Sequence, residues 1–471
     1  MLNRVFDNDT ICAIATPHGM GAIAVVRVSG PEAISVVSQL FTQNSKAFDS
    51  DKMVSHKAYY GHIVDHGELL DEVLVTFFKA PHSFTGENSA EISVHGSVFV
   101  QQKLLQVLIA HGCRMAEAGE FTRRAFVNRK FDLAQAEAIA DLISSESEAA
   151  HRVAINQLKG GFSKELQMMR SKLLEMTSLM ELELDFSEED VEFADRSQLR
   201  ALLQDTLDHV NKLKDSFRLG NAIKNGIPVA IVGQTNTGKS TLLNALLGED
   251  RAIVSDIAGT TRDTIEETLN INGILYRFID TAGLRNTDET IEKIGIERSY
   301  RKISEANVII GMLDATTAYE SMLSSAQEIA SKVDFLHQQL ILCINKVDTL
   351  TDQGEALLGE LRLDLDNDNI MVICLSAKHG FGLNDLYNTL KHSQPLASPD
   401  ATLVTNVRHY EALMHAAESL KSVQQGLEMN IPTDLVSQDL REASFHLGSI
   451  TGEITTDEVL RTIFSRFCIG K

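Results

Sequence analysis

The sequence predicts a multidomain protein of mixed α/β and helical architecture, in which one α/β domain is inserted into a helical domain and another precedes both. The chain has 471 residues, enough for three domains of ~150 residues each. Residues 227–244 change from an apolar strand through a glycine-containing loop to a helix, which is typical of an α/β domain. Apolar residues recur at helical spacing on both sides of that domain.

The N-terminal α/β domain is expected to span residues 1–128. Its apolar runs predict, in order, a strand over 11–15, a strand over 21–28, a helix over 31–40 and a strand over 72–78. The segment from Gly119 to Ala134 is rich in Arg and Lys, and its composition favours a solvated connector.

The first part of the helical domain is expected over residues 129–222. Helical spacing begins at Leu133, and the acidic segment 186–193 is predicted to be a solvated loop. A further amphipathic helix is marked by Leu199, Leu202, Leu203, Leu207, Val210 and Leu213. The stretch from Gly220 to Gly226 is predicted to break this helix, because glycine lowers helix stability.

The second part of the helical domain is expected over residues 393–471. A Pro-containing linker, 392–400, precedes helices that resume near Arg408. Thr455 and Glu458 have the spacing of a capping box at the start of the last helix. That helix carries an apolar stripe of Val459, Leu460, Ile463, Phe464 and Phe467.

Between these two parts, residues 223–392 are predicted to form a P-loop domain of the Ras-like GTPase type. Gly233 to Ser240 fits the phosphate-binding pattern G-x-x-x-x-G-K-[ST]. Glycines let backbone N–H groups approach phosphates, Lys239 reaches the β- and γ-phosphates, and Ser240 offers a hydroxyl to Mg²⁺. The pattern by itself indicates a nucleotide hydrolase without naming the base.

Three further motifs follow predicted strands of the same domain and select GTP. An Asp at a strand end can hold Mg²⁺ through water, and a nearby Gly N–H can sense the γ-phosphate, as expected for Asp280, Thr281, Ala282 and Gly283. In Asn345-Lys346-Val347-Asp348, the final carboxylate can accept guanine N1–H and the 2-amino group. Ser376, Ala377 and Lys378 suit the back of the same base. Four motifs in this order predict GTP binding.

The residues expected to act in catalysis differ from those of many small GTPases. Leu284 stands where those proteins place a water-orienting Gln, and a Leu side chain cannot orient water. Either a nearby carboxylate takes that role, the candidates being Asp288, Glu289 and Glu292, or hydrolysis is intrinsically slow. The loop 255–263 is expected to be the first switch, with Thr261 as a ligand of Mg²⁺ and the γ-phosphate. Arg262 and Arg285 are the near arginines, and neither is an obvious arginine finger.

Composition narrows the class further. The net charge of −22 argues against a broad nucleic-acid-binding surface, so any RNA contact must use local patches or a partner. The five cysteines lack C-x-x-C spacing, and Cys12, Cys343 and Cys374 lie in apolar strands as core residues. We find no signal-peptide pattern and no apolar run of membrane-spanning length, so we expect a soluble cytoplasmic protein.

Over its whole length the sequence resembles the MnmE (TrmE) family of tRNA-modifying GTPases. The most specific features are Phe467-Cys-Ile-Gly-Lys471, Ala258-Gly-Thr-Thr-Arg-Asp263, Asp280-Thr-Ala-Gly-Leu-Arg285 and Ser83-Phe-Thr-Gly-Glu87. The resemblance implies an N-terminal domain that binds folate and dimerises, a discontinuous helical domain and an inserted GTPase domain. The chain has Thr235-Asn-Thr237 where family members often have Pro-Asn-Ala, and Thr237 could alter nucleotide affinity.

The resemblance also implies that two GTPase domains meet across K⁺, which takes the place of an arginine finger. The K⁺ ligands would be Asn236, Ser255, Ile257 and Thr260, and Glu292 would organise the attacking water. Ser240 and Thr261 would hold Mg²⁺. The GTP-binding set would comprise Asn236, Thr237, Gly238, Lys239, Ser240, Thr241, Ser255, Asp256, Ile257, Ala258, Gly259, Thr260, Thr261 and the three later motifs.

For the N-terminal domain, the resemblance implies 5-formyltetrahydrofolate or methylene-tetrahydrofolate at Arg27, Glu91, Lys130 and the terminal Lys471. It makes Cys468 a catalytic residue of tRNA modification. It also implies a homodimer and a heterotetramer with the FAD protein MnmG, which would supply the FAD. Together they would install aminomethyl or carboxymethylaminomethyl groups at C5 of the wobble uridine of certain tRNAs.

A different class remains as the alternative: a GTP-dependent binding switch in ribosome assembly or signalling, without modification chemistry. The GTPase motifs alone fit both classes. The N-terminal domain and the Cys468 tail favour modification, because a pure switch needs neither a folate pocket nor a terminal thiol.

Overall fold

We analysed a computed structural model of the chain. It describes residues 9–44, 46–185, 196–249, 267–271, 273–279, 303–350, 354–365, 367, 369–392, 402–429, 431–465, 467 and 469–470. The chain divides into two compact units. The first comprises residues 1–140, 157–210 and 412–471, and the second comprises 141–156 and 211–411.

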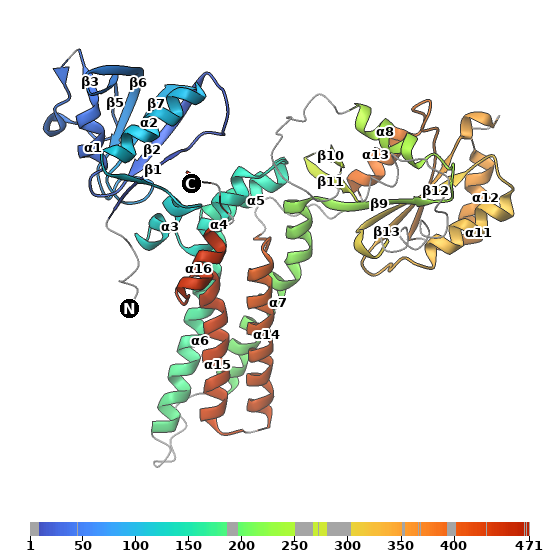
Figure 1. Ribbon diagram of the computed structural model, residues 1–471. Coiled ribbons are helices and arrows are strands. Elements are labelled where there is room, and N and C mark those ends of the chain that lie inside the picture. Colours follow the sequence, from blue (N-terminus) through green and yellow to red (C-terminus); the bar gives the residue numbers. More distant parts are fainter. Residues whose placement is uncertain are drawn as a thin grey trace. The chain divides into compact units, whose positions relative to one another are not determined.

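The first unit contains an eight-stranded sheet with the strand order β4-β3-β5-β6-β7-β2-β1-β8 in its described residues (Figure 1). Neighbouring strands are antiparallel except β1 and β8, which are parallel. The strands are β1 (Thr10–Ile14), β2 (Ile23–Ser29), β3 (Phe41–Gln43), β4 (Lys46–Ala47), β5 (Ala58–Asp65), β6 (Glu68–Phe78), β7 (Ser89–His95) and β8 (Cys113–Met115). All four elements predicted for this domain are present, with boundaries shifted by a few residues.

Alternation along the strands defines the two faces of this sheet. In β2, Ala24, Val26 and Val28 are buried, while Val25 and Arg27 point to the opposite face, because successive side chains of a strand alternate. The inner face packs against α1 (Ala33–Leu40) and α2 (Val98–Ala110) in one hydrophobic core. On the opposite, outer face, Ile11 and Ala13 of β1 pack with Phe121, whereas Leu74 and Ile23 of other strands are exposed.

The basic segment after Gly119 is a helix, α3 (Glu120–Val127), so the expected solvated connector is wrong. Within the helix the cations are paired rather than solvated: Arg124 is 5% exposed, and its Nη2 lies 2.6 Å from Asp9 Oδ1 and 3.0 Å from Glu120 Oε1. Arg129 and Lys130, which follow the helix, are exposed. Phe121 and Ala125 are fully buried beside it. Composition gave the wrong expectation because the carboxylates of Asp9 and Glu120, and not water, pair with the Arg124 guanidinium.

The helical domain is discontinuous, as predicted. The long helix α6 (Gly161–Asp185), which precedes the P-loop domain, packs along α15 (Thr433–Thr451), which follows it (Figure 1). Four further helices have residues in both units: α4 (Leu133–Ile143), α5 (Glu148–Leu158), α7 (Arg196–Asn225) and α14 (Val407–Glu428). The predicted acidic loop 186–193 lies outside the described residues.

Two predicted details of the helical part are wrong. Helix α7 runs through Gly220, where the missing side chain admits the carbonyl of Val404, and ends before Gly226. Gly220 is therefore a point of close backbone approach within the helix. The last helix, α16 (Asp457–Phe464), is capped by Thr456, whose hydroxyl accepts from Val459 N at 3.4 Å, and not by Thr455.

The second unit contains a six-stranded sheet with the order β10-β11-β9-β12-β13-β14 in its described residues (Figure 1). All neighbours are parallel except β10 and β11. Helices α8 and α13 cover one face, and α11 and α12 cover the other. The strands are β9 (Ile227–Gly233), β10 (Glu267–Ile271), β11 (Ile274–Phe278), β12 (Val308–Asp314), β13 (Gln339–Asn345) and β14 (Ile370–Cys374). The helices are α8 (Lys239–Glu249), α11 (Tyr319–Ala330), α12 (Glu355–Leu365) and α13 (Leu383–His392).

This parallel arrangement brings the carboxyl ends of β9, β12, β13 and β14 to one edge, where ligands of such folds bind. Cys12 and Cys343 are fully buried core residues as predicted, whereas Cys374 is half-buried. Among the described residues, none of the helices is long and apolar enough to span a membrane.

Candidate functional site

The phosphate loop joins β9 to α8, and its backbone geometry depends on glycine. Gly238 has φ +98°, and a Cβ there would collide with Asn345 Nδ2. Only glycine fits this position, because any other residue would strain the left-handed backbone and its Cβ would clash with Asn345. The first turn of α8 carries Lys239, Ser240 and Thr241, and the N-terminus of a helix favours an anion.

Two side chains at the loop tip explain the departure from the common sequence. Thr237 is buried, and its hydroxyl donates to Gln234 O at 2.9 Å. This hydroxyl thus closes the loop on itself. Asn236 is exposed with φ +63°, a backbone conformation that Asn tolerates better than most residues. The Thr237 substitution therefore adds a hydrogen bond within the loop.

Lys239 lies folded over the loop that carries it. Its Nζ donates to Gly233 O at 2.9 Å and to Gln234 O at 2.6 Å. Both acceptors are neutral carbonyls. Anionic phosphate oxygens would make stronger, charge-assisted bonds from the same ammonium. Lys239 is thus placed over the loop where it can meet the phosphates.

Asn345 connects three loops at the carboxyl edge of the sheet. It is 3% exposed. Its Nδ2 donates to Thr237 O at 2.8 Å, and its Oδ1 accepts from Ala377 N at 3.0 Å. The phosphate loop, the Asn345–Asp348 turn and the Ser376–Lys378 loop are therefore held together by one buried amide.

Asp348 presents a carboxylate at this edge, in the short 3-10 turn Val347–Thr349. Its side chain is 33% exposed, and its Oδ2 lies 3.6 Å from His379 Nε2. The neighbouring Ser376 hydroxyl holds the pKa of Asp348 below its usual value of 3.8. The carboxylate is therefore ionised and remains an acceptor for the guanine N–H groups across the physiological pH range.

Sequence reasoning missed Asp314, which ends β12 in register with Asn345. Its Oδ2 lies 2.6 Å from Lys346 Nζ, and its Oδ1 accepts from Thr316 N at 2.9 Å and Thr316 Oγ1 at 2.7 Å. The sequence carried a signal for this residue, because residues 308–313 form an apolar run followed by an acid, as the run before Asp280 does.

Many predicted nucleotide residues lie outside the described part of the chain. They are Ser255, Asp256, Ile257, Ala258, Gly259, Thr260, Thr261, Asp280, Thr281, Ala282, Gly283 and Glu292, with the neighbouring Leu284, Asp288 and Glu289. Their roles stay predictions.

In the first unit, the structure brings Arg27 and Glu91 together on the outer face of the sheet. They are cross-strand partners on β2 and β7, with Arg27 Nε 3.0 Å from Glu91 Oε1. The Arg27 guanidinium lies 5.1 Å from the ring centre of Phe84 and 5.7 Å from that of Phe121. This is a half-exposed ion pair bordered by two aromatic rings.

Lys130 contacts the loop that carries Phe84. Its Nζ donates to Pro81 O at 3.1 Å, and the Phe131 ring beside it lies 5.7 Å from that of Phe84. Lys130 and Arg27 thus both contact the segment 81–84, Lys130 at Pro81 and Arg27 at Phe84. Below the loop, Arg124 Nη1 lies 3.3 Å from Glu87 Oε2, whose carboxylate accepts from Ser29 Oγ at 2.8 Å. The loop therefore rests on a buried, paired network.

The C-terminal tail also reaches this domain within the same chain. Ile469 forms an antiparallel bridge with Ala118, and a side chain at Gly470 would collide with Ile14 O of β1. Phe467 and Phe464 pack with Leu133 and Phe126 in a separate small core. Cys468 and Lys471 lie outside the described residues.

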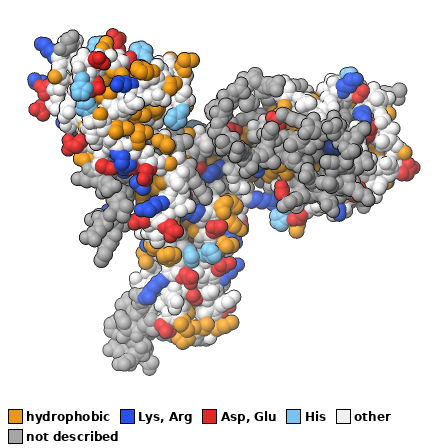
Figure 2. Space-filling view, in the orientation of Figure 1, with side chains coloured by type: hydrophobic (Ala, Val, Ile, Leu, Met, Phe, Trp, Pro, Cys, Tyr) orange, Lys and Arg blue, Asp and Glu red, His pale blue; other side chains and the backbone are white. Residues whose placement is uncertain are grey.

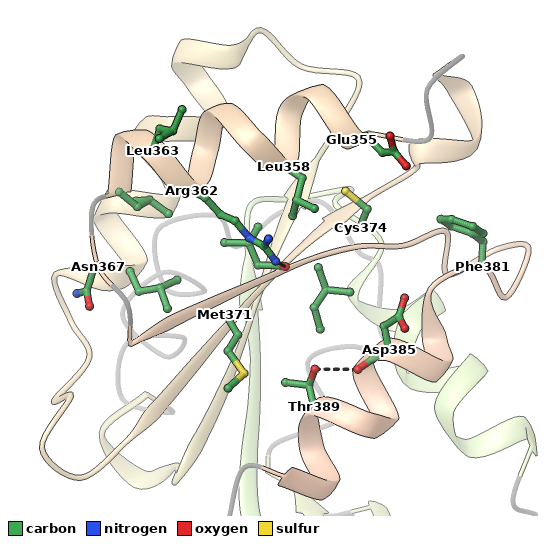
Figure 3. Close-up of a pocket in the computed structure, with 14 residues that line it drawn as sticks. Glu355, Leu358, Arg362, Leu363, Asn367, Met371, Cys374, Phe381, Asp385 and Thr389 are labelled. Atoms are coloured by element: carbon green, nitrogen blue, oxygen red, sulfur yellow. Dashed lines mark hydrogen bonds between the residues drawn. The ribbon is translucent and has the colours of Figure 1, made fainter.

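A cavity of about 760 Å³ beside the edge strand β14 is separate from these sites (Figure 3). Glu355 and Arg362 enter it from α12, and Asp385 enters from α13. It is lined by none of the predicted nucleotide or folate residues.

The covered parallel sheet and the glycine loop, with Asn345 and Asp348 at its edge, define a P-loop GTPase. Two family models match the chain: "GTP-binding protein TrmE N-terminus" over residues 10–130 and "MnmE helical domain" over 133–468. The chain belongs to the MnmE family of tRNA modification GTPases.

Several curated relatives support this assignment over full length, each described as "tRNA modification GTPase MnmE". The Bacteroides fragilis protein is 50% identical over 467 residues, covering 99% of this chain and 100% of the relative. The Bacteroides thetaiotaomicron protein is 51% identical over 471 residues, with 99% and 100% coverage. The Flavobacterium johnsoniae protein is 49% identical over 474 residues, again with 99% and 100% coverage.

Proposed function

We propose that this GTP hydrolase acts with the FAD protein MnmG in the cytoplasm and installs aminomethyl or carboxymethylaminomethyl groups at C5 of the wobble uridine of certain tRNAs. The observation that carries the proposal is the combination in one chain of the buried Asn345 amide that joins the phosphate and base loops, the Arg27–Glu91 ion pair of the N-terminal domain, and a C-terminal tail that pairs with Ala118 of that domain. We propose the domain boundaries 1–128, 129–222, 223–392 and 393–471.

For hydrolysis, we propose that Ser240 and Thr261 hold Mg²⁺ and that Asn236, Ser255, Ile257 and Thr260 hold K⁺. The described residues fit. Ser240 lies in the first turn of α8, and Asn236 is exposed at the loop tip, so its amide oxygen can reach a cation. When bound, the two cations would neutralise charge that develops on the phosphates. Glu292 would orient the attacking water, because Leu284 occupies the position of the usual water-orienting Gln.

For the one-carbon unit, we propose that Arg27, Glu91, Lys130 and Lys471 bind 5-formyltetrahydrofolate or methylene-tetrahydrofolate. The residues present fit such a ligand. The pterin edge of a folate offers N–H donors to a carboxylate such as Glu91, and its glutamate needs cations such as Lys130. Phe84 and Phe121 supply flat apolar surface next to Arg27. Bound folate would supply the one-carbon group, and we propose that Cys468 takes part in that chemistry.

For assembly, we propose a homodimer through the outer face of the N-terminal sheet. Leu74 of β6 pairs with Tyr60 of β5 on this face, and they are 49% and 58% exposed. Ile23 of β2 is 67% exposed. Figure 2 shows one side of the domain that contains this sheet, where hydrophobic side chains reach the surface among polar ones. Exposed apolar groups of this kind mark interaction surfaces.

This face also bears on the folate site, because Arg27 and Glu91 lie in the next row of the same sheet. A partner subunit on the apolar row would therefore stand beside the proposed folate site. MnmG would bind the dimer as a heterotetramer and supply the FAD, and tRNA would contact the assembly.

The test is mass analysis of tRNA wobble nucleosides from cells lacking this protein, with cells expressing the Asp348→Asn variant alongside. Loss of the C5-modified uridines in both strains is expected. If the deleted strain keeps them at wild-type level, the protein has no part in modification and the binding-switch alternative takes its place.

A further inference from the structure

The carboxyl edge of the second sheet holds a charged pair that the GTPase motifs do not include. Asp314 ends β12 and Lys346 follows β13, directly after the strand residue Asn345 that pairs with Asp314. Their side chains are 12% and 36% exposed. A largely buried carboxylate therefore sits beside the base-binding turn.

Asp314 is held in place from both sides. Thr316 donates to its Oδ1 through backbone N (2.9 Å) and Oγ1 (2.7 Å). The adjacent Ala315 N donates to Asn345 O at 3.0 Å, which ties the segment to β13. The remaining Oδ2 faces Lys346 Nζ at 2.6 Å. The carboxylate is thus a rigid anchor rather than a mobile surface acid.

Lys346 needs such an anchor because its backbone is in the left-handed region, with φ +66°. Residues with a Cβ adopt that conformation only when their surroundings hold it. Its carbonyl accepts from Thr349 N at 3.1 Å and from Thr349 Oγ1 at 2.7 Å, which closes the turn that contains Asp348. The ion pair with Asp314 holds the side-chain ammonium of the same residue.

We propose that Asp314 is a positioning residue for guanine nucleotide binding: it holds Lys346, and through Lys346 the turn that aims Asp348 at the base. Asp314 acts on the guanosine end of the ligand and leaves the phosphate loop unchanged. GTP and GDP, which share that end, are therefore affected alike.

The geometry also defines the opposite possibility. Asp314 could draw the Lys346 ammonium away from an incoming nucleotide, and removing the carboxylate would then tighten binding. The two roles give opposite signs in the same measurement, so one titration separates them.

The experiment measures dissociation constants of the full-length chain by displacement of a fluorescent GDP analogue with GDP and with GTP. Asp314→Asn keeps the acceptor for Thr316 but places an amide beside the Lys346 ammonium. We expect both constants to rise about tenfold, the effect of losing one charge-assisted bond in a partly buried site. The turnover number at saturating GTP should change less than about twofold, because uniform binding energy affects affinity and not the chemical step.

Asp364→Asn is the matched control. Asp364, an exposed residue of α12 in the same unit, accepts from the hydroxyl of Tyr319 of α11 at 2.6 Å and, among the described residues, makes no hydrogen bond or ion pair with Lys346 or Asp348. Its dissociation constants should stay at the wild-type value. Thr316→Val, which keeps the Asp314 charge and loses one hydrogen bond, should give a smaller rise than Asp314→Asn and covers the case in which that variant fails to fold.

A second readout is hydrogen exchange over residues 345–350 in nucleotide-free protein, which should speed up in Asp314→Asn and not in Asp364→Asn. Unchanged or tighter GDP binding by Asp314→Asn overturns the proposal. So does a loss confined to GTP, because that would place the effect at the phosphates.

Discussion

Replacing Asn345 with Ala should loosen two loops at once, because one buried amide holds both. The change leaves Thr237 O and Ala377 N without the partners they have at 2.8 and 3.0 Å, in a site that is 3% exposed. A buried polar group that loses its partner costs roughly 1–3 kcal/mol. Two such groups make about 3 kcal/mol a fair expectation, after some relaxation toward water.

The assay is hydrogen exchange with mass analysis of peptides covering residues 233–241 and 376–382 in the full-length chain. Each loop loses one of the two bonds, about 1.5 kcal/mol, and because 1.36 kcal/mol is a factor of ten, protection should fall by roughly tenfold in each peptide. GTP affinity should fall as well, since the phosphate and base loops are no longer fixed to each other.

Asn270→Ala provides the matched control. Asn270 accepts from Gly273 N at 3.0 Å in the exposed turn between β10 and β11, where water can replace the lost bond. Its exchange should change little outside that turn. Wild-type protection in the 376–382 peptide of Asn345→Ala would refute the view that this amide joins the two loops.

The remaining predictions concern the base, the cation, the folate and acid stability. Asp348→Asn should weaken GTP and favour xanthosine triphosphate in direct titration, and unchanged GTP affinity would remove it from the base site. GTP hydrolysis should be faster in K⁺ than in Na⁺, and Glu292→Ala should slow it with little loss of binding; equal rates in both salts argue against the K⁺ site. Glu91→Ala and deletion of residues 468–471 should each weaken 5-formyltetrahydrofolate in calorimetry, and wild-type affinity in both would mean that the pocket is misplaced. Burial opposes ionisation of Glu120, but hydrogen bonds from Arg114 and Arg124 keep its pKa below 4.5. Its stabilisation is therefore complete above pH ~4.5 and lost as the pH falls through the lower folded value, so Glu120→Gln should flatten acid unfolding followed by circular dichroism.

The residues proposed to bind folate show how much charge and spacing alone can predict. Arg27, Glu91 and Lys130 are distant in sequence, and composition by itself favours three separate surface charges. The sheet register makes Arg27 and Glu91 direct cross-strand partners, and Lys130 contacts Pro81 of the loop that carries Phe84. Arg27 and Glu91 are 64 residues apart in the sequence, so their pairing depends on which strands are neighbours in the folded sheet and not on a local pattern.

The sequence by itself determined the P-loop, the base-recognition motifs and the parallel strands that carry them, because these depend on local residue types and on short-range periodicity. It also determined the discontinuous helical domain. Only the tertiary structure decided that the basic segment after Gly119 is a buried helix, that Gly220 stays within α7, and that Asp314 faces Lys346. In each case the deciding partner lies far along the chain: Asp9 for Arg124, Val404 for Gly220, and Lys346 for Asp314. Local composition cannot anticipate a buried counter-charge or a close backbone contact that packing alone supplies.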